Sequence, residues 1–261
     1  MGEILRAENV CKYFGGVKAV DGVSMSVNEG EIVSIIGPNG AGKTTFFNIC
    51  SGYGKATKGK VYFSGEDITA MKPEAISVRG MARTFQKTQL FKYMSVFENI
   101  KVGCHKDTST GMWDAILHTG RYRRDEEYAA KRSREIIQIA GLEAYSGTQA
   151  GNLAYGIQRR VEIARALAGS PRILLLDEPA AGMNPNETQE LMYFIKELNA
   201  NGQTIVLIEH DMKFVMNCSH RIVVLNFGQK ICEGAPEKVK NDPEVQRAYF
   251  GSGMMAKEAF G

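Results

Sequence analysis

Short runs of apolar and β-branched residues recur along the chain, each bounded by glycine, proline or polar residues. Such runs are typical of strands, and those at 31–36, 173–176 and 204–208 should be buried. The last two predicted strands are spaced like a hairpin. The predicted strands lie at 4–13, 23–27, 31–36, 60–64, 173–176, 204–208, 221–227 and 230–233.

A different spacing, with apolar residues three or four positions apart, predicts helices elsewhere. Ile157, Val161, Ala164 and Ala168 follow this spacing and would form one buried stripe. In 125–142, apolar residues fall near one face of a helix and charged residues on the other, as in an amphipathic helix. The predicted helices lie at 45–50, 96–102, 125–142, 156–168, 185–198 and 243–250.

The order of these elements predicts an α/β fold. Strands and helices occur together in 1–86 and 169–250, which we expect to form one core with a small β layer at its start. Only helices are expected in 87–168, so this segment should be an inserted helical subdomain. Residues 251–261 carry few signals of order and are expected to form a mobile tail.

Composition excludes several classes of protein. With 261 residues and 44% hydrophobic content, the chain can bury a globular core. A net charge of +3 is too small to indicate nucleic acid as a partner, and no apolar run approaches the ~18–20 residues that cross a bilayer. The N-terminal segment is too acidic for a secretory signal, and the cysteines lack metal-site or disulfide spacing. We therefore expect a reduced, cytosolic protein.

The strand expected at 31–36 leads directly into the segment GPNGAGKTT. With the helix expected after it, this segment fits G-x-x-x-x-G-K-[ST] in the strand–loop–helix context that the motif requires. Its backbone N–H groups would point at phosphate oxygens, Lys43 would reach the β- and γ-phosphates, and Thr44 would offer its hydroxyl to Mg²⁺. The predicted nucleoside-triphosphate site comprises Gly37, Pro38, Asn39, Gly40, Ala41, Gly42, Lys43, Thr44 and Thr45.

Two acidic residues follow the apolar strand at 173–176. If this central strand ends beside the phosphate loop, Asp177 would support the Mg²⁺ shell. Glu178, one residue further, could polarise a water for attack on the γ-phosphorus. An acidic pair in a surface turn would be the better interpretation only if the phosphate loop were absent.

Two other polar residues are candidates for the same site. His210 follows the strand at 204–208, whose end should lie on the same edge of the sheet, so a γ-phosphate contact is favoured over a structural role. Gln86 follows a strand-like segment and could bond the Mg²⁺ shell or the attacking water, although its spacing alone fits an ordinary polar residue.

The segment LAYGIQRR at 153–160 leads into the helix expected at 156–168. Gly156 at the start of that helix would present backbone N–H groups to an anion, which makes a second phosphate site possible. A helix cap beside a solvated basic face fits these residues equally well, so the pattern alone leaves both interpretations open.

Over almost its whole length the chain resembles the ATP-binding subunits of ABC transporters. GPNGAGKTT is similar to their Walker A motif, LAYGIQRR to their signature, and ILLLDEP to Walker B with its glutamate. The resemblance puts Gln86 at the Q-loop, His210 at the switch histidine and 181–184 at the D-loop. Phe14 falls where the family stacks an aromatic ring on adenine, with Tyr13 as a rival and a core position for Phe14 as the alternative.

The resemblance implies a RecA-like P-loop core with an N-terminal antiparallel β layer and an inserted helical subdomain. Two copies, or this chain and a related one, would pair head to tail, with ATP and Mg²⁺ between one Walker A motif and the other signature. The implied signature contacts are Ala154, Tyr155 and Gly156. The implied catalytic residues are Glu178, His210 and Gln86, and the implied metal ligands are Thr44, Gln86 and Asp177.

Within the family, the chain most resembles the ATPases of branched-chain amino-acid importers, because of LAYG, DEPAAGMNP, IEHDM, the insertion after Val102 and the ending RAYFG. Ala154 replaces a signature serine and Ile157 a glutamine, which puts the side-chain contacts there in question. The resemblance implies membrane-spanning permease subunits as partners, a solute-binding protein as an indirect partner, and no nucleic acid. The chain would lie peripherally on the cytoplasmic face of the inner membrane.

Two other interpretations stay open. The chain could serve another ABC system, such as urea import or lipid export, or it could be a soluble ABC ATPase of DNA repair, translation or iron–sulfur assembly. DNA-repair members need a long coiled coil, and translation factors usually carry two cassettes, whereas this chain has one Walker A motif. A P-loop GTPase is disfavoured because no N-K-x-D motif occurs.

Overall fold

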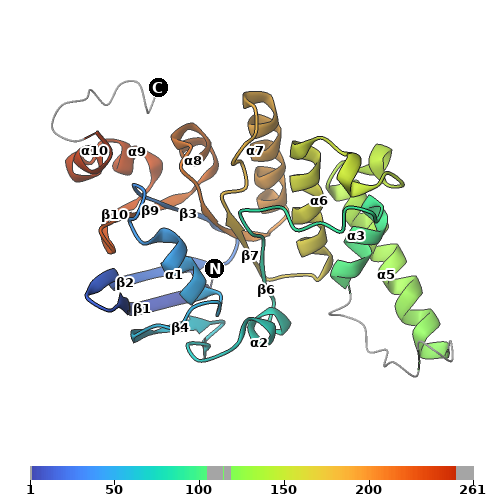
Figure 1. The fold of residues 1–261 in the computed structure, drawn as a ribbon, viewed down its shortest axis with the longest axis horizontal. Helices are drawn as coiled ribbons and strands as arrows, with labels where there is room; N and C mark the ends of the chain where they lie inside the picture. Colours follow the sequence, from blue (N-terminus) through green and yellow to red (C-terminus); the bar gives the residue numbers. More distant parts are fainter. Residues whose placement is uncertain (1, 105–113, 115–118, 251–261) are drawn as a thin grey trace. The chain divides into compact units, whose positions relative to one another are not determined.

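A computed structural model describes residues 2–104, 114 and 119–250 of the chain, and the expected tail at 251–261 lies outside this range. The chain forms two compact units, whose elements are labelled in Figure 1. The first unit comprises Met1–Arg83 and Arg172–Gly261, and the second comprises Thr84–Pro171.

The first unit begins with an antiparallel sheet in the order β2-β1-β4-β5. In this sheet β1 (Glu3–Phe14) pairs with both β2 (Val17–Asn28) and β4 (Lys58–Phe63), and β5 (Glu66–Asp67) adds a short edge. This sheet confirms the predicted β layer. The strand predicted at 23–27 was too short, because pairing with β1 extends it back to Val17 through exposed polar residues that interrupt the apolar pattern.

A second sheet in the first unit has the order β10-β9-β3-β8-β7-β6. All its neighbours are parallel except the hairpin of β9 (Arg221–Asn226) and β10 (Gln229–Gly234). Every residue of the three central strands is buried, as expected for a parallel sheet covered on both faces. These central strands are β3 (Ile32–Ile36), β8 (Thr204–Ile208) and β7 (Ile173–Asp177).

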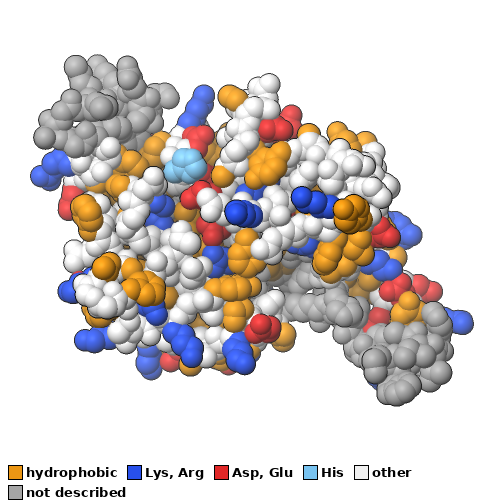
Figure 2. Space-filling view, viewed as in Figure 1, with side chains coloured by type: hydrophobic (Ala, Val, Ile, Leu, Met, Phe, Trp, Pro, Cys, Tyr) orange, Lys and Arg blue, Asp and Glu red, His pale blue; other side chains and the backbone are white. Residues whose placement is uncertain are grey.

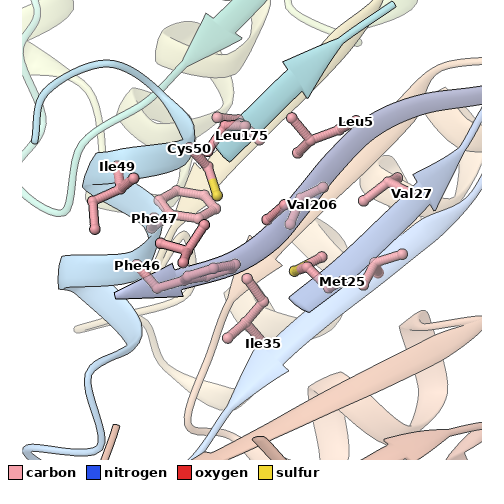
Figure 3. Packing of buried hydrophobic residues seen from close by; sticks show 14 of the residues in the cluster. Leu5, Met25, Val27, Ile35, Phe46, Phe47, Ile49, Cys50, Leu175 and Val206 are labelled. Atoms are coloured by element: carbon pink, nitrogen blue, oxygen red, sulfur yellow. The ribbon is translucent and has the colours of Figure 1, made fainter. Parts of the chain in front are cut away.

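The helix after the phosphate loop, α1 (Lys43–Cys50), packs between the two sheets. Figure 3 shows Phe46 and Phe47 of this helix beside Val206 of the second sheet, with Leu5 and Met25 of the first sheet close by. Both phenylalanine side chains are almost fully buried, which at roughly 25 cal/mol per Å² makes them major contributors to this core. Burial of α1 therefore fixes the direction of the phosphate loop that precedes it.

Several short elements of the first unit escaped the sequence pattern. Segments of two to seven residues are too short to show a helical or strand period clearly. The remaining helices α7 (Pro185–Ala200) and α10 (Pro243–Phe250) were predicted. The missed elements are α2 (Pro73–Val78), α8 (Met212–Cys218), α9 (Pro236–Lys240) and the two-residue β5, while the strand-like segment expected before Gln86 is observed earlier, as β6 (Met81–Arg83).

The second unit is helical in its described part and contains α3 (Val96–Gly103), α5 (Gly120–Ile139) and α6 (Tyr155–Ala168), with short 3₁₀ turns at Glu143–Tyr145 and Ala150–Asn152. The predicted helix at 125–142 was wrong at both ends. The α5 helix begins earlier because Thr119 caps it, accepting a hydrogen bond from the backbone of Tyr122. It ends before Gly141, which has a left-handed φ of 60°.

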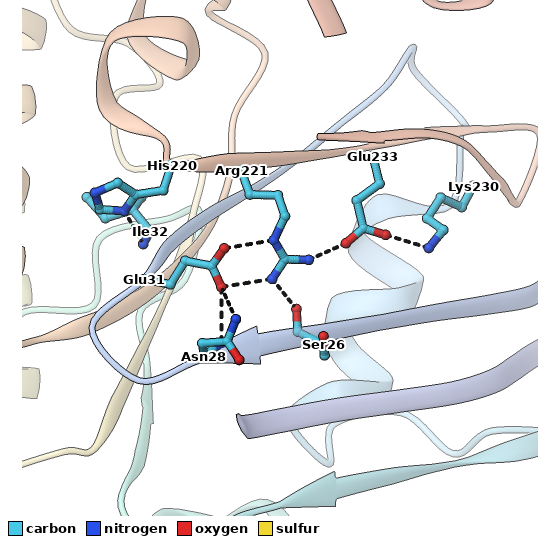
Figure 4. Close-up of polar contacts among 8 residues, drawn as sticks. All are labelled: Ser26, Asn28, Glu31, Ile32, His220, Arg221, Lys230 and Glu233. Carbon is cyan, nitrogen blue, oxygen red and sulfur yellow. Dashed lines mark hydrogen bonds and ion pairs between the residues drawn. The ribbon is translucent and has the colours of Figure 1, made fainter. Parts of the chain in front are cut away.

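A cluster of charges joins the two sheets of the first unit (Figure 4). Arg221 binds both carboxylate oxygens of Glu31 at 2.7 and 2.8 Å, donates to the backbone carbonyl of Ser26, and pairs with Glu233. Burial would raise the pKa of Glu31, but the hydrogen bonds from Arg221 and the backbone of Asn28 outweigh it and lower this pKa. The cluster therefore stabilises the folded state most when Glu31 is ionised.

We predict that Arg221→Met lowers the free energy of unfolding at pH 7 by on the order of 3 kcal/mol, because Glu31 loses its cation. A lowered folded pKa gives stability above the unfolded value of about 4.3, and this stability is lost as pH falls through the folded value. The difference between wild type and variant, measured by urea denaturation, should therefore shrink in acid.

Arg172→Met is the matched control, because Arg172 pairs with Glu29 at 3.0 Å while both side chains stay 50% exposed. Its cost should be no more than about 0.5 kcal/mol. Equal losses in the two variants would contradict the assignment of stability to the partly buried cluster around Arg221.

Candidate nucleotide-binding site

The phosphate loop connects the buried strand β3 to α1, as predicted. Gly42 occupies the N-cap position of α1 with φ 96°, in the left-handed region. A Cβ atom there would lie 2.3 Å from the carbonyl oxygen of Ala19, so both the conformation and the space require glycine. The loop is therefore pressed against the backbone of the N-terminal sheet.

The side chain of Lys43 folds back over the phosphate loop. Its Nζ atom donates hydrogen bonds to the carbonyl oxygens of Gly37 at 2.6 Å and Pro38 at 3.0 Å. Burial lowers the pKa of Lys43 from its usual value, and the nearby charge of Glu178 acts in the opposite direction. The loop thus holds a cationic donor beside its own backbone, where a phosphate would be bound.

A cleft of about 390 Å³ opens beside this loop. It brings together most of the predicted phosphate-loop residues and Glu178, together with residues that the sequence did not indicate. The lining residues are Val17, Lys18, Ala19, Asn39, Gly40, Ala41, Gly42, Lys43, Thr44, Thr45, Glu178 and Phe227.

Phe227, in the turn between β9 and β10, is the unexpected aromatic residue of the cleft and is 86% exposed. The turn is fixed through Gly228, whose N–H donates to Ala41 of the phosphate loop at 3.0 Å and whose carbonyl accepts from Asp21 at 2.8 Å. The glycine of a hairpin turn was the only signal in the sequence, and it carried no indication that the turn meets the loop.

Phe14 and Tyr13, the rival aromatic residues, lie at the end of β1. Phe14 is 56% exposed, which excludes the alternative of a core residue, and Lys12 lies over its ring at 5.0 Å. Tyr13 donates its hydroxyl to Asp21 at 2.7 Å. Of the two side chains, Phe14 is the more accessible, although it does not line the cleft beside the phosphate loop.

The acidic residues lie at the carboxyl edge of the second sheet. In that sheet β8 lies between β3 and β7, so the strand of Asp177 is not the direct neighbour of the strand that precedes the phosphate loop. Asp177 is buried and binds Arg83 of β6 at 2.7 Å. Arg83 also donates to Ser51 at the end of α1, so a cation that the motifs did not reveal connects Asp177 to the helix that follows the phosphate loop.

Glu178 and His210 lie together at this edge. Glu178 has a left-handed φ of 45°, and its side chain lines the cleft. Its Oε2 atom is 3.9 Å from Nδ1 of His210, an imidazole that is 62% exposed. A carboxylate and an exposed imidazole beside a phosphate loop are suited to orienting water and phosphate.

The second unit carries Gln86 and the segment at 153–160. Ala154 is the N-cap residue of α6 and provides no side-chain capping bond, and Tyr155 and Gly156 form the first positions of the helix. The buried Arg159 donates to the carbonyl oxygens of Phe85, at 2.7 Å, and Gln86. The helix α6 is therefore bonded to the backbone of Phe85 and Gln86 within this unit.

Glu162, one turn further along α6, completes the same arrangement. It pairs with Arg159 at 3.0 Å and accepts a hydrogen bond from the backbone of Gln89. The exposed fractions of the Arg159 and Glu162 side chains are only 2% and 3%, so the pair is buried. Removing either one would leave a buried charge, so the pair fixes the Q-loop segment firmly.

Comparison with known proteins decides the family. The sequence profile described as ABC transporter matches residues 20–181. This chain belongs to the ABC transporter family. A second profile, described as branched-chain amino acid ATP-binding cassette transporter, matches residues 229–254.

Relatives of this ABC protein extend over nearly the full length of the chain. The high-affinity branched-chain amino acid transport ATP-binding protein LivG of Salmonella typhimurium is 46% identical over 95% of this chain and 98% of its own. LivG of Escherichia coli is 45% identical over the same shares. The corresponding protein BraF of Pseudomonas aeruginosa is 43% identical, again over 95% and 98%.

Solved ATP-binding cassettes share the fold. A nucleotide-free cassette from an ABC transporter is 38% identical, with a TM-score of 0.82 over 96% of this chain and 100% of its own. The ADP conformation of a cassette is also 38% identical, with a TM-score of 0.84 over 97% and 100%. The predicted P-loop fold with its β layer and inserted helical subdomain is confirmed, and this ABC protein is an ATPase.

The side chains of the ABC site suit a nucleotide together with a divalent cation. No group of three or more His, Cys, Asp or Glu side chains that could hold a metal occurs within the described residues. Mg²⁺ commonly takes one or two protein ligands and completes its shell with phosphate oxygens and water. The hydroxyl of Thr44 and the carboxylates of Asp177 and Glu178 are groups of the right chemistry for that mode of binding.

We predict that Gly42→Ala destabilises the nucleotide-free ABC protein by on the order of 3 kcal/mol, because it adds a steric clash with Ala19 to backbone strain. Gly40→Ala is the matched control, since Gly40 also has a positive φ, of 80°, but has open space where its Cβ would lie. It should cost only about 1–2 kcal/mol. Thermal unfolding without nucleotide measures both, and equal losses would show that the loop can move away from Ala19.

Proposed function

We propose that this chain is the ATP-hydrolysing subunit of an importer of branched-chain amino acids. The observation that carries the proposal is the identity of 43–46% over 95% of the chain to three proteins that are each named for branched-chain amino acid transport. The match of a branched-chain transporter profile to residues 229–254 supports the same conclusion from a separate part of the sequence.

In the proposed site, the backbone from Gly37 to Thr45 binds the phosphates, and Lys43 supplies a positive charge at the β- and γ-phosphates. Mg²⁺, held by Thr44, Asp177 and Gln86, would neutralise charge on the phosphate oxygens. The Arg83–Asp177 contact of 2.7 Å would hold the carboxylate of Asp177 in a fixed orientation. Phe14 would stack on the adenine.

Hydrolysis is assigned to the carboxyl edge of the second sheet. Glu178 would accept a proton from the attacking water, since its carboxylate lines the cleft. His210, 3.9 Å from Glu178, would align the γ-phosphate and the water. Gln86 would sense the metal from the second unit, where its backbone carbonyl accepts a hydrogen bond from Arg159.

A second ATPase subunit is proposed to complete the site. The first turn of α6, from Ala154 to Gly156, would contact the γ-phosphate of ATP bound to the partner. With alanine at the N-cap position, this contact would depend on backbone N–H groups and the helix dipole rather than on a serine hydroxyl. The partner could be a second copy of this chain or a related one.

Permease subunits would supply the membrane passage and would place this chain on the cytoplasmic face of the membrane. None of the helices in the described range is long and apolar enough to span a bilayer. The second unit exposes Phe91 and Tyr93, at 50% and 90%, shortly after the Q-loop, and these are proposed to receive a permease helix. On the face shown in Figure 2, basic and acidic side chains are interspersed with exposed hydrophobic ones.

We predict that Glu178→Gln lowers the rate of ATP hydrolysis by roughly 10²–10⁴-fold while ATP still binds, because only the proton acceptor is lost. Lys43→Ala should lose nucleotide affinity first, since it removes the charge that binds phosphate. Equilibrium ATP binding and single-turnover hydrolysis separate the two effects. Glu178 is not the catalytic base if its glutamine variant hydrolyses ATP at the wild-type rate or binds ATP as poorly as Lys43→Ala.

The proposed solute is tested by transport. The chain, reconstituted with its permease and binding protein in vesicles, should support ATP-dependent uptake of leucine, isoleucine or valine, and the Glu178→Gln complex should not. Uptake of urea without uptake of any apolar amino acid would reject the proposed solute and leave the ATPase mechanism unaffected.

A further inference from the structure

A buried carboxylate lies directly behind the proposed catalytic edge and has no role in the mechanism so far. Glu209 occupies the position between β8 and His210, and only 1% of its surface is exposed. Its Oε1 atom accepts a hydrogen bond from the backbone N–H of Ala180 at 2.8 Å, and its Oε2 atom accepts one from His210 at 3.1 Å. The backbone of Asp211 also bonds to this carboxylate.

These hydrogen bonds join two segments that are far apart in the sequence. Ala180 lies in the turn that follows Glu178, directly before 181–184, and His210 lies 30 residues away, just after another strand. Glu209 therefore bridges the backbones that carry the proposed base and the switch histidine. The backbone N–H of Glu178 itself bonds to Ile208, so the turn is attached to β8 at two points.

Burying the carboxylate of Glu209 costs free energy, which argues against an incidental role for this side chain. Burial raises the pKa of Glu209, and the backbone hydrogen bonds from Ala180, His210 and Asp211 oppose that effect. In the described part of the chain its hydrogen-bond donors are backbone amides rather than a lysine or arginine. A carboxylate is the side chain that offers two equivalent acceptor oxygens, so it can bond both segments at once.

The conformation of Glu178 shows why such a bridge is needed. Glu178 has a left-handed φ of 45°, which is unfavourable for a residue with a Cβ and persists only where the surrounding structure enforces it. The bond from Ala180 to Glu209 fixes the chain two residues later. We propose that Glu209 is a positioning residue, which holds Glu178 and His210 next to each other without touching the nucleotide.

This inference rests on the proposed roles of Glu178 and His210. The main test is Glu209→Gln, which keeps the size of the side chain but provides only one acceptor oxygen in place of two. Its kcat should fall by roughly 10- to 100-fold, the usual effect of misplacing a reacting group by about an ångström. Its KM and its equilibrium ATP affinity should change less than about threefold, because the phosphate loop is intact.

Thr204→Val controls for the loss of a buried hydrogen bond in the same strand. Thr204 lies at the opposite end of β8, is also buried, and accepts a hydrogen bond from the backbone of Gly30 at 3.0 Å. Its loss should lower the melting temperature but leave kcat unchanged. A fall in kcat for Glu209→Gln that is matched by Thr204→Val would overturn the proposal, because general destabilisation would then explain both.

A double-mutant cycle measures whether Glu209 acts through Glu178. In the Glu178→Gln background, adding Glu209→Gln should lower single-turnover hydrolysis less than threefold, because there is no carboxylate left to align. The proposal would be overturned if Glu209→Gln lowered hydrolysis by the same factor in the Glu178→Gln background as in the wild type, or if the single variant Glu209→Gln had the wild-type kcat. If Glu209→Gln does not fold, Glu209→Asp decides on the same criteria, since it is too short to reach both amides. Wild-type hydrolysis by Glu178→Gln alone would instead reject the proposed base.

Discussion

The phosphate loop is held by the backbone of two other segments, one earlier in the sequence and one much later. Ala19 of β2 approaches Gly42 so closely that no side chain fits, and Gly228 of the β9–β10 turn bonds to Ala41. These contacts fix the loop, while burial of Phe46 and Phe47 in the core fixes α1. The position of the nucleotide site therefore depends on both sheets of the first unit being in place.

Charge is arranged around this loop before any nucleotide arrives. Lys43 is hydrogen-bonded to the loop carbonyls, and Asp177 is paired with Arg83. Both charged groups are therefore held in place by contacts within the folded chain. Arg83 also lies over the ring of Phe47 at 4.9 Å, which links the acidic strand to the core beneath α1.

The strands, the long helices and the phosphate loop could be predicted because apolar runs and a contiguous motif report local structure. The partners of those motifs could not, since they depend on contacts between residues far apart in the sequence. Arg83 pairs with Asp177 from the neighbouring strand, and the turn that carries Phe227 into the cleft bonds to the phosphate loop. Glu209 was visible in the sequence as part of IEHDM, but nothing local distinguishes a buried bridging carboxylate from a surface acid. The roles of Glu178, His210 and Gln86 stay predictions.

Within the second unit, the Arg159–Glu162 pair connects the segment around Gln86 to the start of α6. Arg159 donates hydrogen bonds to the carbonyls of Phe85 and Gln86, and its own helix begins at Tyr155. The pair is buried, so moving Arg159 away from the backbone of Phe85 and Gln86 would leave buried polar groups without their hydrogen bonds. Any displacement of this unit should therefore carry Gln86 and the start of α6 together. A displacement of one of them would reach the other through a single arginine side chain.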